Sequence, residues 1–326
     1  MEKNKIEMIT STNDYLVFLP RRIFSTHILC KNDLQNISSD NLLITSGNLK
    51  KNQYEKAREM YEQLNNLPVF AKYDLAWMYF NGLGGERRVS DAVKLMQEIT
   101  NQSHPSDIIY CAYFNIGCAY YEGVGVKQSD VEAEYWWLQA AQDGFTGGCV
   151  KAMSVLGMYY SRLGEEKYDL KKAHYWHQEA TGNGSIESQT ALGVMYENGI
   201  YVKKDVKASF KCFKSAAERG GVYAMGHLAL QYYKHKMFKN AAIVSKRVGS
   251  LDDSLYFSKK TDSLEFYVKK GIAMGCFVYG RCIEHKLGDV NANEDPNYWY
   301  KRAVYFDMDT SQYLQNLIPY DIVYTC

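Results

Sequence analysis

Small, aromatic and glycine positions recur along this chain with fixed spacing. In its full form, the repeat has small or apolar residues at the first, fifth and ninth positions, a glycine or alanine at the sixth, and glycines at the twelfth and fourteenth. A run of the form Ala-x-x-Trp-x-x-x-Ala-Ala follows, and a glycine closes the copy. The fullest copy consists of Ala112, Ile116, Gly117, Tyr120, Gly123, Gly125, Ala133, Trp136, Ala140, Ala141 and Gly144. This pattern predicts two helices per copy.

The first and last residues of successive copies are separated by the same number of residues. Ala152 lies 40 residues after Ala112, and Gly184 lies 40 residues after Gly144. The next copy begins at Ser188, 36 residues further on. Weaker copies begin at Ala71, Ala224 and Gly275. A period of this length is typical of helix-pair arrays, so we predict six stacked units, the last three less regular.

The residue types explain why such units stack. The small residue at the sixth position lets two helices approach, and the glycine pair ends the first helix because glycine adopts left-handed conformations. In the second helix we expect Trp136 and Trp176 to bury their large rings. One hairpin cannot bury both of its faces, so neighbours complete the core. The predicted fold class is all-α, a right-handed solenoid of stacked helix pairs.

The repeat pattern resembles a known family, the Sel-one-like repeats, which are related to tetratricopeptide repeats. The similarity covers residues 71–305, and the runs 119–127 and 172–184 resemble megalin-binding members of the family in particular. What the resemblance implies is a cytoplasmic adaptor for the tail of megalin, a large endocytic receptor related to the low-density lipoprotein receptor. The spacing alone implies a solenoid and no partner.

Segments outside the regular copies divide the chain further. We expect residues 1–44 to form a variable, poorly ordered segment, and 45–70 to form tetratricopeptide-like capping helices. The array should run from 71 to 307, with an inserted loop near 250–262 because Gly, Asp and Ser gather there. Residues 308–326 should form a C-terminal cap or tail.

Composition favours a soluble protein of the cytoplasm. The chain has 326 residues, of which 46% are hydrophobic, and a formal net charge of +1. The near-zero charge argues against capture of nucleic acid, which needs clustered Lys and Arg. No apolar run approaches the roughly 20 residues of a membrane span, and the first residues lack the apolar core of a signal peptide. We therefore expect no direct membrane insertion.

The cysteine and histidine residues are candidates for a catalytic site or a metal site. The eight cysteines include no Cys-x-x-Cys pair, so packing roles are expected for Cys111, Cys118 and their like. His174 and His177 stand three apart on a predicted helix, a spacing that suits zinc. No third ligand is evident, so the pair is expected to be solvent-facing or at a groove edge. We expect no cofactor and no metal.

A partner groove is expected along the first helices, opposite the stripe that packs between units. Aromatic and Met side chains there would supply rigid contact area for a peptide. The candidate binding residues are Tyr73, Trp77, Phe80, Phe114, Tyr121 and Met158. In the fourth unit the same stripe holds Glu187, Thr190, Val194 and Glu197. Burial of the aromatic stripe under the preceding helix or the N-terminal segment is an equally good alternative.

The favoured function is a non-enzymatic cytoplasmic scaffold that binds, and could thereby regulate, a megalin-type receptor tail. An adaptor in endoplasmic-reticulum quality control or in a signalling complex is the alternative. A hydrolase that uses a cysteine and a histidine is the third reading, and it requires a thiol with a lowered pKa.

Overall fold

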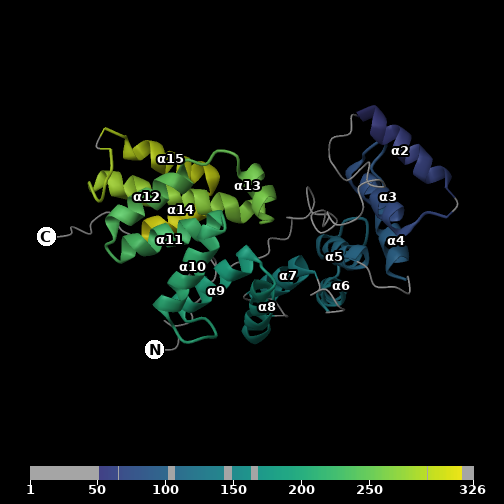
Figure 1. Cartoon of the computed structure of the whole chain (residues 1–326), viewed down its shortest axis with the longest axis horizontal. Helices are drawn as coiled ribbons and strands as arrows, with labels where there is room; N and C mark the ends of the chain where they lie inside the picture. Colours follow the sequence, from purple (N-terminus) through teal and green to yellow (C-terminus); the bar gives the residue numbers. More distant parts are fainter. Residues whose placement is uncertain are drawn as a thin grey trace. The chain divides into compact units, whose positions relative to one another are not determined.

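Helices make up all the regular structure in the described part of the chain. The computed structural model describes residues 51–64, 66–101, 107–142, 149–162, 168–291 and 293–317. These ranges hold fifteen helices, α2 to α16, and no strand (Figure 1). The expectation for residues 1–44 lies outside the described residues.

The chain divides into two compact parts between Leu156 and Gly157, within helix α7, Val150–Tyr160. The part before this boundary contains two predicted units and the helix that precedes them. Its helices are α2 (Lys51–Gln63), α3 (Val69–Asn81), α4 (Val89–Thr100), α5 (Asp107–Glu122) and α6 (Asp130–Ala141). The pairs α3–α4 and α5–α6 are the predicted hairpins.

The part after the boundary holds the later units. Its helices are α8 (Leu170–Gly182), α9 (Ile186–Asn198), α10 (Val206–Glu218), α11 (Val222–Lys234), α12 (Phe238–Gly249), α13 (Ser254–Thr261), α14 (Glu265–Glu284), α15 (Pro296–Phe306) and α16 (Met308–Leu317). The expected leading residues fall in the first helices α3, α5, α7, α9, α11 and α14. The predicted order of helix pairs is thus confirmed.

Side-chain caps and glycines set the ends of these helices. Asp169 and Asp205 cap α8 and α10, because each carboxylate accepts hydrogen bonds from two backbone N–H groups of the first turn. Gly82 and Gly199 end α3 and α9 in the left-handed conformation, with φ of 67° and 70°. The predicted role of the first glycine of each pair is confirmed at these two ends.

Helix α14 lies at the centre of the C-terminal helices, in contact with α11, α12, α13, α15 and α16 (Figure 1). It is the longest helix described, with 20 residues, and every residue from Lys270 to Ile283 is buried. The predicted loop at 250–262 is instead largely the short helix α13. Asp253 caps this helix by accepting a hydrogen bond from the N–H of Tyr256, so this residue starts a helix rather than a loop.

Three successive hairpins, α5–α6, α7–α8 and α9–α10, are each closed by a ring that lies over a glycine of the first helix. A Cβ added at Gly117 would lie 2.5 Å from Trp137, and one at Gly193 would lie 2.6 Å from Phe213. The sequence pattern predicts the buried ring at the preceding residue, Trp136. Trp137 is fully buried whereas Trp136 is half-buried, so the predicted register of the second helix is wrong by one position.

No helix in the described ranges combines the length and apolar character that a bilayer crossing requires.

Candidate protein-binding groove

Four of the six predicted binding residues lie in the interior of the protein. The side chains of Tyr73, Phe114, Tyr121 and Met158 are between 0% and 4% exposed. Trp77 and Phe80 are half-buried. The expected open aromatic wall is therefore absent at the four buried positions, because tight packing of the hairpins covers this stripe. A contact of the six residues with a partner stays a prediction.

The buried members make contacts that suit core residues. Tyr73 accepts a hydrogen bond from Asn115, at 2.9 Å, and the Tyr121 ring lies 5.3 Å from that of Trp137. The hydroxyl of Tyr267 contacts the Met158 sulfur at 3.7 Å. Each of these contacts joins two different helices, so the stripe stabilises the fold.

The same stripe reaches cavities in the fourth unit. Glu187 and Thr190 of α9 line one cavity, and Val194 and Glu197 line another. The two cavities therefore follow the face that the sequence pattern assigned to the groove. These four residues of α9 are not among the six candidates, because the candidates have aromatic or Met side chains and these four are polar or aliphatic.

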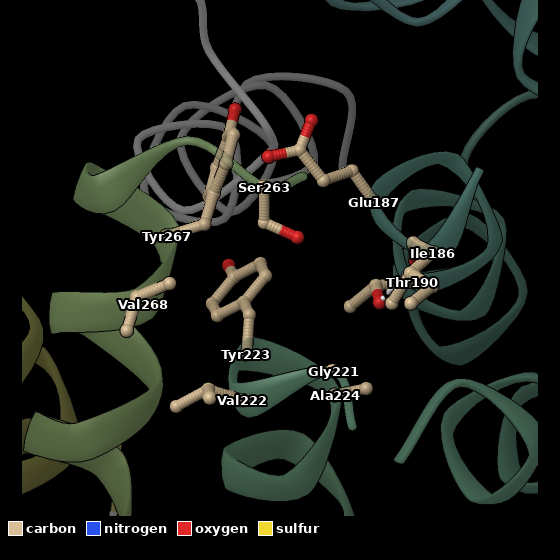
Figure 2. A pocket seen from close by; sticks show the side chains of 10 residues that line it. All are labelled: Ile186, Glu187, Thr190, Gly221, Val222, Tyr223, Ala224, Ser263, Tyr267 and Val268. Carbon is tan, nitrogen blue, oxygen red and sulfur yellow. Dashed lines mark hydrogen bonds between the residues drawn. The ribbon is translucent and has the colours of Figure 1, made fainter. Parts of the chain in front are cut away.

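The first cavity is enclosed by α9, α11 and the start of α14. Figure 2 shows the rings of Tyr223 and Tyr267 on one side and Glu187 and Thr190 on the other. The Glu187 carboxylate accepts a hydrogen bond from the backbone N–H of Leu264, which ties α9 to the segment before α14. The two tyrosine rings lie 5.2 Å apart. This cavity is small, about 10 Å³, and fits no more than about one water-sized group.

The second cavity takes residues from four helices, α9, α11, α14 and α16. Three of these are first helices of successive units, and α16 follows the last hairpin. The lining residues are Val194, Glu197, Asn198, Tyr223, His227, Leu230, Lys234, Met274, Thr310, Tyr313 and Leu314. Its volume is about 30 Å³, which fits roughly two water-sized groups. We call it the Glu197 cavity.

An ion pair and a neutral histidine give the Glu197 cavity its polar character. The Lys234 ammonium donates to Glu197 Oε1 at 3.0 Å, and the other carboxylate oxygen, Oε2, faces His227 Nδ1 at 3.9 Å. Burial lowers the pKa of His227 to about 4, although Glu197 opposes this shift. The imidazole is therefore uncharged at neutral pH, and its ring stacks on Phe213 at 4.7 Å.

His227, Lys234 and Tyr313 line this cavity but are not among the binding residues that the sequence pattern predicts. The first two belong to one of the weak copies, and Tyr313 lies beyond the array in the predicted tail. Their shared location depends on how α11 and α16 pack beside α9. One sequence signal does point to this cavity. When the spacing that defines the groove stripe is applied to α11, it selects Tyr223 and Leu230, which also line the cavity.

Three of the described cysteines lack the lowered pKa that a cysteine hydrolase requires. Burial raises the pKa of Cys276 and of Cys282 to about 12, and it also raises the pKa of Cys212. A catalytic cysteine needs a lowered pKa. These three side chains therefore act as packing groups.

The predicted histidine pair is split between two environments. His177 is 1% exposed, which contradicts its expected solvent-facing position, and burial lowers its pKa to about 3. Its Nδ1 lies 3.2 Å from Ser188 Oγ, while half-buried His174 packs near Tyr201. Among the described residues, no group of three or more His, Cys, Asp and Glu side chains is arranged to hold a metal ion.

Comparison with known proteins agrees with this geometry. The family model described as Sel1 repeat matches residues 45–67, 69–104, 112–145, 150–185 and 186–221, half of the chain in total. The chain belongs to the Sel1 repeat family. Sel1 repeats are typically non-catalytic protein-interaction scaffolds. The predicted helical-repeat solenoid is thereby confirmed.

Two curated relatives share part of this chain. An Arabidopsis thaliana protein, ERAD-associated E3 ubiquitin-protein ligase component HRD3B, is 27% identical over 174 residues, 49% of this chain. The rat (Rattus norvegicus) DAP3-binding cell death enhancer 1 is 31% identical over 90 residues, 28% of this chain. The matches cover 26% and 16% of the lengths of those proteins.

Two solved structures share the fold. The Sel1 repeat protein from Oxalobacter formigenes superposes with a TM-score of 0.55 at 24% identity, over 77% of this chain and 92% of that one. The protective antigen c5321 of uropathogenic Escherichia coli, described as having an SLR fold, gives a TM-score of 0.53 at 18% identity over 81% of this chain and 61% of that one.

Proposed function

We propose that this protein is a cytoplasmic, non-enzymatic adaptor that binds a segment of a partner protein along the faces of its first helices. One observation carries the proposal: α9, α11 and α14, the first helices of three successive units, all contribute side chains to the Glu197 cavity. In stacked helix pairs, such a shared face is the usual binding surface. The raised thiol pKa values at Cys276 and Cys282 argue against the hydrolase reading.

The favoured partner is the cytoplasmic tail of a megalin-type receptor, which binding would regulate. The support is the resemblance of residues 119–127 and 172–184 to megalin-binding members of the family. Residues 172–182 lie on α8, where Tyr175 is exposed and His177 is buried. The likeness therefore includes both core and surface positions, and the core positions alone would support the fold rather than the partner.

A binding measurement with purified components tests this partner. The receptor tail, as a labelled peptide, is titrated with the full chain and with a Lys234→Glu variant, in which the Glu197 ion pair is replaced by repulsion. We expect saturable binding to the wild-type chain and at least about tenfold weaker binding to the variant. A Lys239→Glu variant is the control, because Lys239 lies on α12 and pairs with exposed Asp289. Absence of saturable binding to the wild-type chain contradicts the megalin assignment.

An adaptor in endoplasmic-reticulum quality control is the second candidate, and the HRD3B relative favours it. The chain would then bind a ubiquitin-ligase component rather than a receptor tail. Proximity labelling of the full chain in cells separates the two. Enrichment of ligase components without endocytic receptors would favour the second candidate, and the reverse pattern would favour megalin.

A further inference from the structure

The Glu197 cavity contains polar groups that the fold itself leaves unsatisfied. Neither ring nitrogen of His227 has a hydrogen-bond partner, and the residue is 8% exposed. The hydroxyl of Thr310, which is 3% exposed, also has none. Each such buried group costs about 1–3 kcal/mol relative to a satisfied one. Both residues line the same cavity, from α11 and α16.

The hydrogen-bonding capacity of these groups can be counted. A neutral imidazole has one N–H donor and one accepting nitrogen, and a threonine hydroxyl can donate. The carboxylate oxygen Glu197 Oε2 lies 3.9 Å from His227, so it adds an acceptor that the imidazole does not reach. The cavity therefore offers two acceptors and two donors within a space of about 30 Å³.

The charges around the cavity favour an uncharged occupant. Glu197 is already paired with Lys234, and Lys270 and Asp307 add one nearby charge of each sign. A cation in the cavity would lie beside the Lys234 ammonium, and an anion would lie beside the Glu197 carboxylate. Both arrangements are unfavourable where water is largely excluded.

We infer that the Glu197 cavity is a subsite for a side-chain carboxamide, an asparagine or glutamine of the bound partner segment. A carboxamide has two N–H donors and a carbonyl oxygen with two lone pairs, which matches the two acceptors and two donors of the cavity. Its apolar stem would pack against Leu230, Met274 and the ring of Tyr223. This inference rests on the proposed adaptor function and specifies the chemistry of the segment that the adaptor binds.

Selection from a random 12-residue peptide library displayed on phage tests the inference with the full chain. We expect enriched peptides to share an Asn or Gln at one position. In the best peptide, its replacement by Leu should weaken binding to the wild-type chain about tenfold or more, the effect of one or more lost hydrogen bonds. Replacement by Glu should weaken binding at least as much, because the added charge lies beside Glu197.

Protein variants locate the effect in the cavity. On a Thr310→Val chain, the Gln→Leu change in the peptide should cost at least about threefold less than on the wild-type chain, because one of the hydrogen-bonding partners is gone. His227→Phe should behave similarly, since Phe keeps the ring that stacks on Phe213. Ser311→Ala is the matched control: Ser311 is the next residue on α16, its hydroxyl donates to Asp307, and it does not line the cavity. On this control the full tenfold loss should remain.

Each other outcome has a defined meaning. Enriched peptides without a shared Asn or Gln, or an unchanged Gln→Leu loss on both cavity variants, overturn the carboxamide subsite and leave the adaptor function intact. Failure to enrich any peptide contradicts peptide binding by this chain, and the subsite falls with it. The Leu and Glu peptides are measured on the wild-type chain, so a poorly folding variant does not remove the test.

Discussion

Gly157 on α7 and His177 on α8 are in direct contact: a Cβ added at the glycine would lie 2.5 Å from the imidazole Nδ1. The same relation joins Gly117 to Trp137 and Gly193 to Phe213. A glycine on the first helix and a ring on the second therefore close three successive hairpins. The ring stands 20 residues after the glycine in each pair.

We predict that Gly157→Ala destabilises the protein by about 1–3 kcal/mol or more, because the new methyl group overlaps a fully packed ring. Chemical denaturation measures the change in unfolding free energy. Gly182→Ala is the matched control, since a Cβ there would meet nothing within 4 Å and Gly182 ends α8. Alanine at that position should be neutral or stabilise by about 0.5–1 kcal/mol. Equal effects of the two substitutions would contradict the packing described for Gly157.

Stability should fall as pH decreases from 7 to 5. Burial lowers the pKa values of His177 and His227 to about 3 and about 4, below the ordinary value of 6.5. The unfolded chain therefore binds more protons than the folded chain in this window, and each histidine contributes a loss of about 2 kcal/mol by pH 5. Groups facing these rings are His174 for His177, and Glu197, Lys234 and Lys270 for His227.

The His177→Phe variant provides the check on this assignment. Phe213 occupies the corresponding position in the next unit, so phenylalanine fits the hairpin. Denaturation at pH 5, 6 and 7 should show about 2 kcal/mol less pH dependence in the variant than in the wild-type chain. A slope unchanged by the substitution would show that His177 is not a proton-linked group.

Phe114→Ala should cost about 3–5 kcal/mol of stability, because its side chain is 1% exposed in the core. Half-buried Phe80 is the matched comparison, and Phe80→Ala should cost less than half as much. Thermal denaturation of the two variants measures this difference. If Phe114→Ala instead keeps the wild-type stability and loses a partner, the residue belongs to a binding surface after all.

Native-state alkylation at pH 7.5 should leave Cys276 and Cys282 largely unmodified. Their pKa values of about 12 keep the thiolate fraction near 1 in 10,000 or lower at that pH, and burial limits access further. Mass spectrometry of each cysteine, with and without urea, gives the rates. We expect at least about 100-fold slower labelling in the folded chain. Rapid labelling of one of these thiols at neutral pH would revive the hydrolase reading.

The sequence by itself determined the helices and their order. The spacing from Ala112 to Ala152, and the glycines that adopt left-handed conformations at Gly82 and Gly199, are local features. Helical periodicity and backbone freedom act within a few residues, so a single sequence records them. The same periodicity places Val194 and Glu197 on one face, and both line a cavity.

Only the tertiary structure decided which side chains that face exposes. Trp136 and Trp137 differ by 100° around one helix, and the choice of buried ring depends on where the facing glycine lies. Phe114 is covered and Glu197 lines a cavity although both occupy the same stripe, because the packing of neighbouring helices differs between units. His227 and Thr310 line one cavity from helices α11 and α16, and no spacing along the chain specifies that arrangement.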